Sequence, residues 1–178
     1  AAGSWITLFG NGLASNSRTW TASEVVNGKL PESLDGVKVT INNQPASVYY
    51  ISPKQINVQA PSDTATGQVQ VSVTNENGTS TPVTVDLNPF MPAFFQLGQE
   101  YVAAVRADGA YIGPAGLIDG VTTVPAQPGD QISLFGTGFG PTTPDVAAGA
   151  VVNAAAPLSN KIAIQIDTAQ ANVSFAGL

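Results

Sequence analysis

The 178-residue chain contains no histidine and no cysteine. Histidine is the commonest general base in enzymes, and the usual nucleophilic triads place it beside serine or cysteine. Its absence excludes those triads, and the absence of cysteine excludes disulfides and thiolate metal sites. A serine–lysine pair or a carboxylate pair stays open. However, the lysines lie on polar strand faces or in loops, and the acidic residues are spread singly. We therefore predict no enzyme, no catalytic residue and no cofactor.

Charge is scarce as well, at 10% of the residues against about 25% in a typical globular domain. Only six residues are Lys or Arg, they are scattered, and the net charge is −6. Nucleic acids and anionic membrane surfaces need clustered cations, so neither is an expected partner. No apolar run reaches the length of about 18 residues that a membrane span requires. A surface of Thr, Ser, Asn, Gln and Gly suits secreted β-modules, and we expect an extracellular or cell-surface location.

Metal binding without histidine or cysteine would have to use oxygen ligands, which suit calcium. The acidic loop candidates are Asp108 in RADGA and Asp145 in TPDVA, with one carboxylate each. A single carboxylate in a turn usually serves the turn itself. We predict no metal site.

Strand patterns dominate what is present. Apolar and polar residues alternate with a period of two, which is typical of half-buried strands, at residues 37–41, 56–59, 69–74 and 83–87. Asn77-Gly78 predicts a tight hairpin turn between the last two of these segments. The best helix candidate, 21–28, is short and polar. Short strands separated by Gly, Pro and Asn predict an all-β fold of the sandwich type.

The sequence also contains an internal repeat. ITLFGNGL at 6–13 returns as ISLFGTGF at 132–139, and a shift of 126 gives six identities within residues 3–12. A shift of 125 then places Val37, Val39 and Ile41 on Ile162, Ile164 and Ile166. We predict two tandem modules, 1–88 and 89–178, the second led by a hairpin around Asp108-Gly109. The second copy lacks counterparts of the last three strands, so we expect either a truncated end or completion by another chain.

Four stretches carry a family resemblance: GSWITLFGNGLA, LDGVKVTINNQPASVYYISPKQINVQAP, MPAFFQLGQEYVAAVRADGAYIGPAG and, after it, PGDQISLFGTGFGPTTP. Together they resemble the Solibacter uncharacterised C-terminal domain family, whose modules are similar to Ig-like IPT/TIG folds. The resemblance implies two tandem Ig-like β-sandwich modules in a secreted bacterial protein. It supplies no catalytic or ligand-binding residues to carry over, and both ends look clipped relative to the family pattern.

Glycines and aromatic residues are the remaining candidates for a site. Gly10, Gly12, Gly136 and Gly138 have neither the lysine nor the helix of a phosphate loop, so they predict bends or bulges. Trp20, Tyr49 and Tyr111 are candidate ligand-stacking residues for a sugar, and the alternative is scattered surface aromatics. FMPAFF at 90–95 is interpreted as interdomain packing.

These patterns predict a non-catalytic extracellular interaction module that serves adhesion, carbohydrate attachment or spacing in a secreted or cell-surface protein. The expected partners are other protein chains or surface polysaccharide. The alternative is a structural subunit of an extracellular fibre, in which copies associate through open strand edges at Gly3 and at 173–178.

Overall fold

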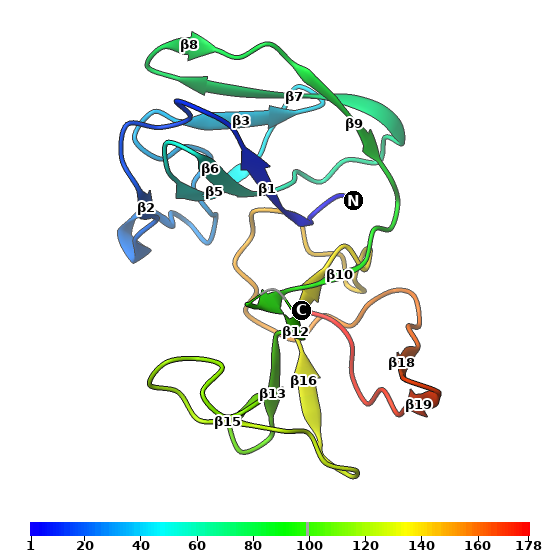
Figure 1. Ribbon diagram of the computed structural model, residues 1–178. Coiled ribbons are helices and arrows are strands. Elements are labelled where there is room, and N and C mark those ends of the chain that lie inside the picture. Colours follow the sequence, from blue (N-terminus) through cyan, green and yellow to red (C-terminus); the bar gives the residue numbers. More distant parts are fainter. Residues whose placement is uncertain (99) are drawn as a thin grey trace. The chain divides into compact units, whose positions relative to one another are not determined.

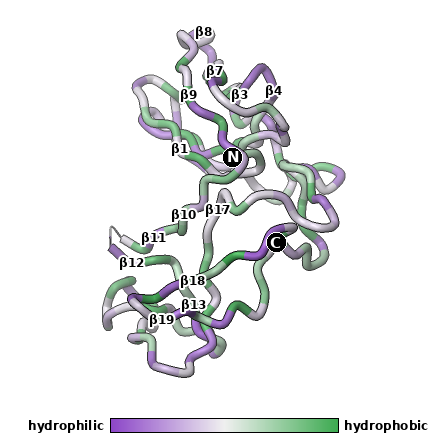
Figure 2. Tube along the Cα trace, turned by 90° about the vertical axis from the view of Figure 1, so that its right-hand side faces the viewer, coloured by the Kyte–Doolittle hydropathy of each residue, from purple (hydrophilic) through white to green (hydrophobic). Residues whose placement is uncertain are grey.

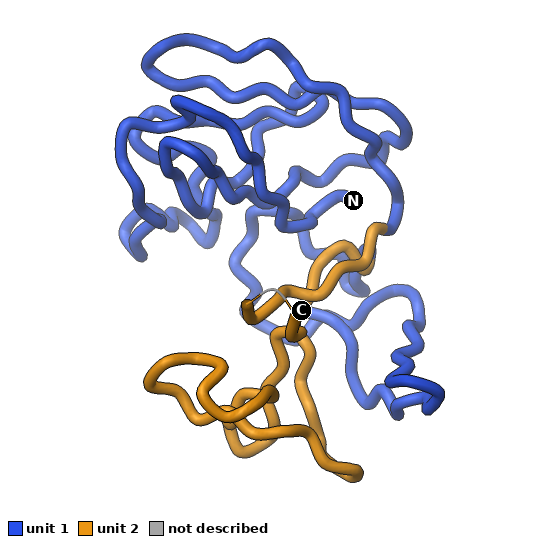
Figure 3. The backbone as a smooth tube through the Cα atoms, viewed as in Figure 1, with its two compact units in different colours: residues 1–90, 140–178 blue, residues 91–139 orange. Residues whose placement is uncertain are grey.

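A computed structural model describes residues 1–98 and 100–178 (Figure 1). By mutual contact the chain forms two compact units (Figure 3): unit 1, which comprises 1–90 with 140–178, and unit 2, which comprises 91–139. Strands dominate both units, so the all-β prediction is confirmed. The only helical element among the described residues is the 3₁₀ turn η1 (Ala22–Glu24), inside the best helix candidate. The boundary after residue 88 was predicted from the sequence repeat, and it stays a prediction.

The first copy of the repeat folds as two sheets (Figure 1). One sheet has the order β1-β6-β5-β2, and its strands are β1 (Trp5–Phe9), β6 (Gln55–Gln59), β5 (Ser47–Ile51) and β2 (Arg18–Thr19). The other has the order β4-β3-β7-β8, with β9 also paired to β7. Its strands are β4 (Gln44–Pro45), β3 (Lys38–Ile41), β7 (Gly67–Asn75), β8 (Gly78–Thr79) and β9 (Val83–Leu87). All these pairings are antiparallel, as in an Ig-like sandwich.

The core lies between these sheets and follows the predicted alternation. One cluster contains the inward residues Val37, Val39, Ile41, Ile56, Val58, Val69, Val71 and Val73. Strand β9 departs from the pattern, because only Leu87 is buried while Val83 and Val85 are exposed. Hydropathy alternates along the chain and forms no long apolar run (Figure 2). No helix in the described ranges is long and apolar enough to cross a membrane.

A β-bulge in β5 changes which side chains face the core. Val48 pairs with Val58 and Tyr50 pairs with Asn57, so Tyr49 is the extra residue. Strict alternation along β5 would place Val48 and Tyr50 inside and Tyr49 outside with Ser47. Instead, Val48 and Ile51 are fully buried, Tyr50 is half-buried and Ser47 is buried, while Tyr49 is exposed as expected. A bulge re-aims side chains because it adds one residue to one strand of the pair.

Unit 2 consists of short strands. Its four-stranded sheet has the order β15-β14-β13-β16, with β15 (Thr123–Val124), β14 (Tyr111–Ile112), β13 (Ala104–Arg106) and β16 (Ile132–Leu134). Two further pairs join β10 (Ala93–Phe94) to β17 (Gly136–Thr137) and β11 (Gln96–Leu97) to β12 (Tyr101–Val102). The hairpin predicted around Asp108-Gly109 is the antiparallel pair β13–β14.

The repeat is visible in backbone geometry. Strands β18 (Ile164–Ile166) and β19 (Ala169–Ala171) form a hairpin in which Ile166 pairs with Ala169, as Ile41 pairs with Gln44 in β3–β4. The residue after the first strand has a left-handed φ in both hairpins, 52° at Asn42 and 54° at Asp167. All three pairs of positions are related by the same shift of 125. The second hairpin therefore repeats the register of β3–β4, although its turn differs at the second residue, because Asn43 has a left-handed φ of 61° and Thr168 does not.

Two of the four repeated glycines, Gly12 and Gly138, lie at bends as predicted, whereas Gly136 lies in β17. Gly12 and Gly138 have φ values of 63° and 77°, where glycine is strongly favoured. A side chain at Gly12 would meet open space, whereas a Cβ at Gly138 would collide with the carbonyl oxygen of Met91. The loop after β16 is therefore more tightly packed than the equivalent loop after β1.

Candidate functional site

Three aromatic rings gather on the sheet that contains β5. Trp20 follows β2, and its ring centroid lies 4.9 Å from that of Tyr49 in an edge-on arrangement. Trp5 of β1 completes the group, with its ring centroid 6.0 Å from Trp20 and 5.9 Å from Tyr49. Such tilted and edge-on contacts are the favoured aromatic geometries. We call Trp5, Trp20 and Tyr49 the aromatic cluster.

The aromatic cluster is part core and part surface. Trp20 packs against the buried core and is half-buried, as is Trp5. Tyr49 remains 39% exposed because the bulge places it outside the core. The Trp20 backbone N–H donates to the Tyr49 carbonyl oxygen at 3.2 Å, which ties the two ring-bearing segments together. The surface that results is apolar and held by a rigid sheet.

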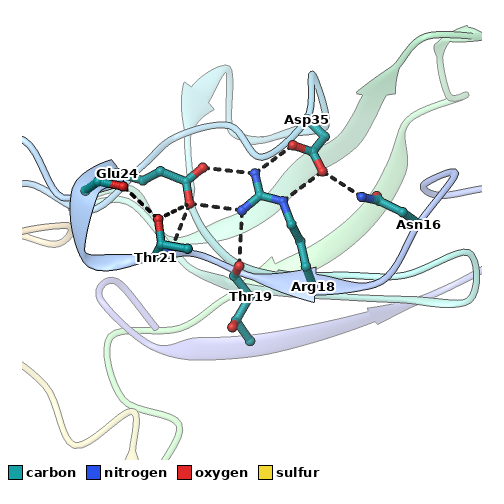
Figure 4. Close-up of polar contacts among 7 residues, drawn as sticks. Asn16, Arg18, Thr19, Thr21, Glu24 and Asp35 are labelled. Carbon is teal, nitrogen blue, oxygen red and sulfur yellow. Dashed lines mark hydrogen bonds and ion pairs between the residues drawn. The ribbon is translucent and has the colours of Figure 1, made fainter.

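Arg18, Glu24, Asp35 and Asn16 form a polar network that we call the arginine clasp (Figure 4). Arg18 of β2 donates to both carboxylate oxygens of Glu24 at 2.9 Å, and to both oxygens of Asp35 at 2.8 and 2.7 Å. It also donates to the Thr19 carbonyl at 3.1 Å. Asn16 adds a bond to Asp35 at 2.8 Å. Every guanidinium nitrogen is therefore engaged within the protein.

The clasp perturbs the pKa of each charged member. Hydrogen bonds from Arg18, then from the Thr21 backbone, lower the pKa of Glu24 to about 2. Arg18, then Asn16, lowers the pKa of Asp35 to about 2. The two carboxylates in turn raise the pKa of Arg18, Asp35 contributing most. These groups stay charged at any physiological pH and cannot act as an acid or a base there.

The clasp joins the two elements that flank Trp20 in the sequence. Through Glu24 it ties β2, which precedes Trp20, to η1, which follows it, and through Asp35 it ties β2 to a later turn. Bidentate arginine–carboxylate bonds fix orientation as well as distance. We infer that Arg18 is a positioning residue that holds Trp20 against Tyr49.

The structure brings together two of the three predicted stacking residues, Trp20 and Tyr49. The third, Tyr111, is a half-buried residue of β14 in unit 2. Trp5 was not predicted, although the sequence held a signal for it. Ile6 and Leu8 pack against the core, so alternation places Trp5 on the opposite face of β1. The interdomain interpretation of FMPAFF stays a prediction.

Of the two single carboxylates considered for metal binding, Asp108 serves its own turn. Asp108 accepts two bonds from Arg106 and one from the backbone N–H of Ala110. These contacts lower the pKa of Asp108 to about 2, the Arg106 bond having the largest effect. In the described part of the chain, no three His, Cys, Asp or Glu side chains cluster as metal ligands would.

One hollow of about 210 Å³ lies between the loop after β1 and the β7–β8 turn, lined by residues 11–13, Val73, Asn75 and 77–80. The Asn75 side-chain amide donates to the carbonyls of Gly12 and Leu13 at 2.8 and 3.1 Å. It therefore closes the loop around the hollow, and none of the predicted stacking residues lines it.

Comparison with known proteins gives one family assignment. No curated protein and no solved structure matches the chain. The model of the IPT/TIG domain family matches residues 1–86, which span both sheets of the first copy. Domains of this family are generally non-catalytic interaction or spacer modules. The proposed kinship with the Solibacter family stays a prediction. Residues 1–86 are thus similar to an IPT/TIG domain, in keeping with the two antiparallel sheets of the first copy.

Proposed function

We propose that the chain is a non-catalytic interaction module of a secreted or cell-surface bacterial protein, and that the aromatic cluster is its contact site for carbohydrate. One observation carries the proposal: the ring centroids of Trp5, Trp20 and Tyr49 lie within 6.0 Å of one another, and Tyr49 remains 39% exposed. The sparsely charged surface supports the extracellular setting.

Sugar chemistry suits such a surface. A pyranose ring presents a patch of C–H groups on its faces and hydroxyl groups around its rim. Aromatic side chains with a polar edge bind well at half-wet sites, because the ring buries apolar surface while its O–H or N–H finds a partner. The clasp reduces the conformational entropy that binding would otherwise cost, since Trp20 is already held in place.

The experiment is a glycan array, with sedimentation onto insoluble polysaccharides, that compares the wild-type chain with Tyr49→Ser and Tyr49→Phe. We expect Tyr49→Phe to retain binding and Tyr49→Ser to lose roughly tenfold in affinity, in the range of an interface residue. Phe9→Ser is the matched control, because Phe9 is a 78% exposed aromatic of β1 that has no place in the cluster. Binding that Phe9→Ser weakens as much as Tyr49→Ser would refute the proposal, as would no binding to any glycan.

A second candidate is a structural subunit that assembles through strand edges. The edges expected from the sequence carry backbone bonds within the chain. Gly3 donates to the Ala60 carbonyl at 3.2 Å, and Leu178 and Ala156 exchange two bonds of 2.9 Å. A different edge favours this candidate: β18 has one strand neighbour where its counterpart β3 has two. Concentration-dependent association in light scattering would support it, and a monomer at every concentration would refute it.

A further inference from the structure

Strand β18 is the counterpart of a central strand, yet it lies at an edge. In the first copy β3 pairs with β4 on one side and with β7 on the other. In the second copy β18 pairs with β19 in the same register, and no other strand among residues 1–98 and 100–178 pairs with it. An unpaired strand edge presents a row of free N–H and C=O groups that can accept another strand.

The first copy identifies which groups face the open edge. The Asn42 N–H donates to the Gln70 carbonyl at 2.9 Å, so Asn42 and, by alternation, Thr40 face β7. Their counterparts at a shift of 125 are Asp167 and Gln165. The Asp167 carbonyl accepts a bond of 2.9 Å from the Gln165 side-chain amide. A side chain therefore occupies the carbonyl that a partner strand would reach.

The apolar face of the hairpin is uncovered in the same place. Ile41 is 5% exposed in β3, whereas Ile166, its counterpart, is 61% exposed. Ile164 is only half-buried, while its counterpart Val39 is fully buried. A partner that pairs with β18 would therefore extend both a ladder of hydrogen bonds and an apolar face.

We propose that the open edge of β18 pairs antiparallel with β18 of a second copy of this chain. By the shift of 125 from β3, the residues whose N–H and C=O groups face the edge are 163, 165 and 167, and of these Gln165 lies within β18. A twofold register that sets Ile164 against the partner's Ile164 brings these groups into hydrogen-bonding positions. It also sets Ile166 against the partner's Ile162, which makes one continuous apolar face.

Charge complementarity selects this register. It sets Lys161 against the partner's Asp167, and by symmetry Asp167 against the partner's Lys161. In the described part of the chain neither side chain is in an ion pair. The position of Asp167 suits such a contact, because Asn42, its counterpart, donates to Asp63 on the segment that leads into β7 at 2.7 Å. Opposite charges directly across a strand pair are favourable.

The edge is short, so the dimer is expected to be weak and concentration-dependent. This inference rests on the second candidate function above and is independent of carbohydrate binding. If the wild-type chain associates but β18 variants do not alter that association, the interface is wrong while the assembly function survives.

The test is sedimentation equilibrium from about 10 µM to about 1 mM, the range for weak interfaces. We expect the average mass of the wild-type chain to rise from 18.1 kDa toward twice that value. Gln165→Pro removes an edge N–H while β18 keeps its backbone pairing with β19, and it should stay monomeric. Gln165→Thr restores the residue found at Thr40 and should still dimerise. Dimers that tolerate Gln165→Pro would overturn the proposal.

Charge reversal tests the register. Lys161→Glu sets two acidic side chains opposite each other, and Asp167→Lys sets two basic ones, so each variant alone should associate roughly tenfold more weakly. An equimolar mixture of the two restores opposite charges and should regain the wild-type dimer. Failure of the mixture to associate overturns the register, provided that circular dichroism shows both variants folded. If the wild-type chain stays monomeric and binds a peptide of the β7 sequence, the proposal that a second copy pairs with β18 is overturned.

Discussion

Alanine substitution of two isoleucines at equivalent positions of the repeat should have very different effects. Ile41 in β3 is 5% exposed and lies in the cluster between the two sheets of the first copy, whereas Ile166 in β18 is 61% exposed. Removing a buried isoleucine side chain to alanine costs about 2–5 kcal/mol, through lost burial and the cavity left behind. Surface substitutions usually stay within about 0.5 kcal/mol.

We therefore expect Ile41→Ala to lower the free energy of unfolding by about 3 kcal/mol, and Ile166→Ala to lower it by less than about 0.5 kcal/mol. For a chain of this length, about 3 kcal/mol corresponds to a fall in Tm of roughly 6–12 °C. Both changes replace isoleucine with alanine. The difference between their effects on the free energy of unfolding therefore measures how deeply each side chain is buried.

The assay is urea denaturation at low micromolar concentration, followed by tryptophan fluorescence and by circular dichroism. Both tryptophans, Trp5 and Trp20, lie in the first copy, so fluorescence reports that copy alone. Circular dichroism reports the strands of both copies. Equal losses for Ile41→Ala and Ile166→Ala would refute the reasoning, because they would mean that the second hairpin is as well covered as the first.

Three further predictions concern the clasp and the glycines. The pKa of Glu24 is depressed to about 2, so its contribution to stability is present above about pH 4.5 and is lost as pH falls toward 2. Arg18→Met should flatten the dependence of the urea midpoint on pH across that window, and an unchanged slope would contradict the clasp. Gly138→Ala should destabilise unit 2 strongly in thermal denaturation because its Cβ would meet backbone. Gly12→Ala should cost only about 1 kcal/mol of left-handed strain. Gly149→Ala would bring a Cβ to 2.7 Å from the Ser47 Oγ, so limited proteolysis should release 140–178 faster than in the wild type.

The strands and core of the first copy could be predicted from the sequence because both follow from a period of two. Val39 and Ile41 face inward as their alternation requires. The repeat likewise aligned Ile41 with Ile166 at a shift of 125, and the structure places these two residues at equivalent positions of two hairpins. Local pattern determines local structure well where one face of a strand is buried.

Features that depend on tertiary pairing could not be predicted in the same way. The bulge at Tyr49 inserts a residue into β5, and alternation carries no sign of it. Strand β16, the counterpart of β1, pairs with β13 instead of with a counterpart of β6. The clasp joins Arg18 to an acidic residue 17 positions away, a separation with no sequence signature.

Amide hydrogen exchange in dilute solution tests the central claim, that the second hairpin repeats the first but leaves its outer edge open. Thr40 of the first hairpin and Gln165 of the second are equivalent residues. The N–H group of each points away from its own hairpin partner, toward the outer side of the hairpin. The Thr40 amide bonds to β7, so it should exchange only with global or large-scale opening. We predict that the Gln165 amide exchanges at nearly the rate of an unstructured peptide, while the neighbouring Ile166 amide is slower. Equal protection at Thr40 and Gln165 would contradict the account, because it would mean that another strand already covers β18.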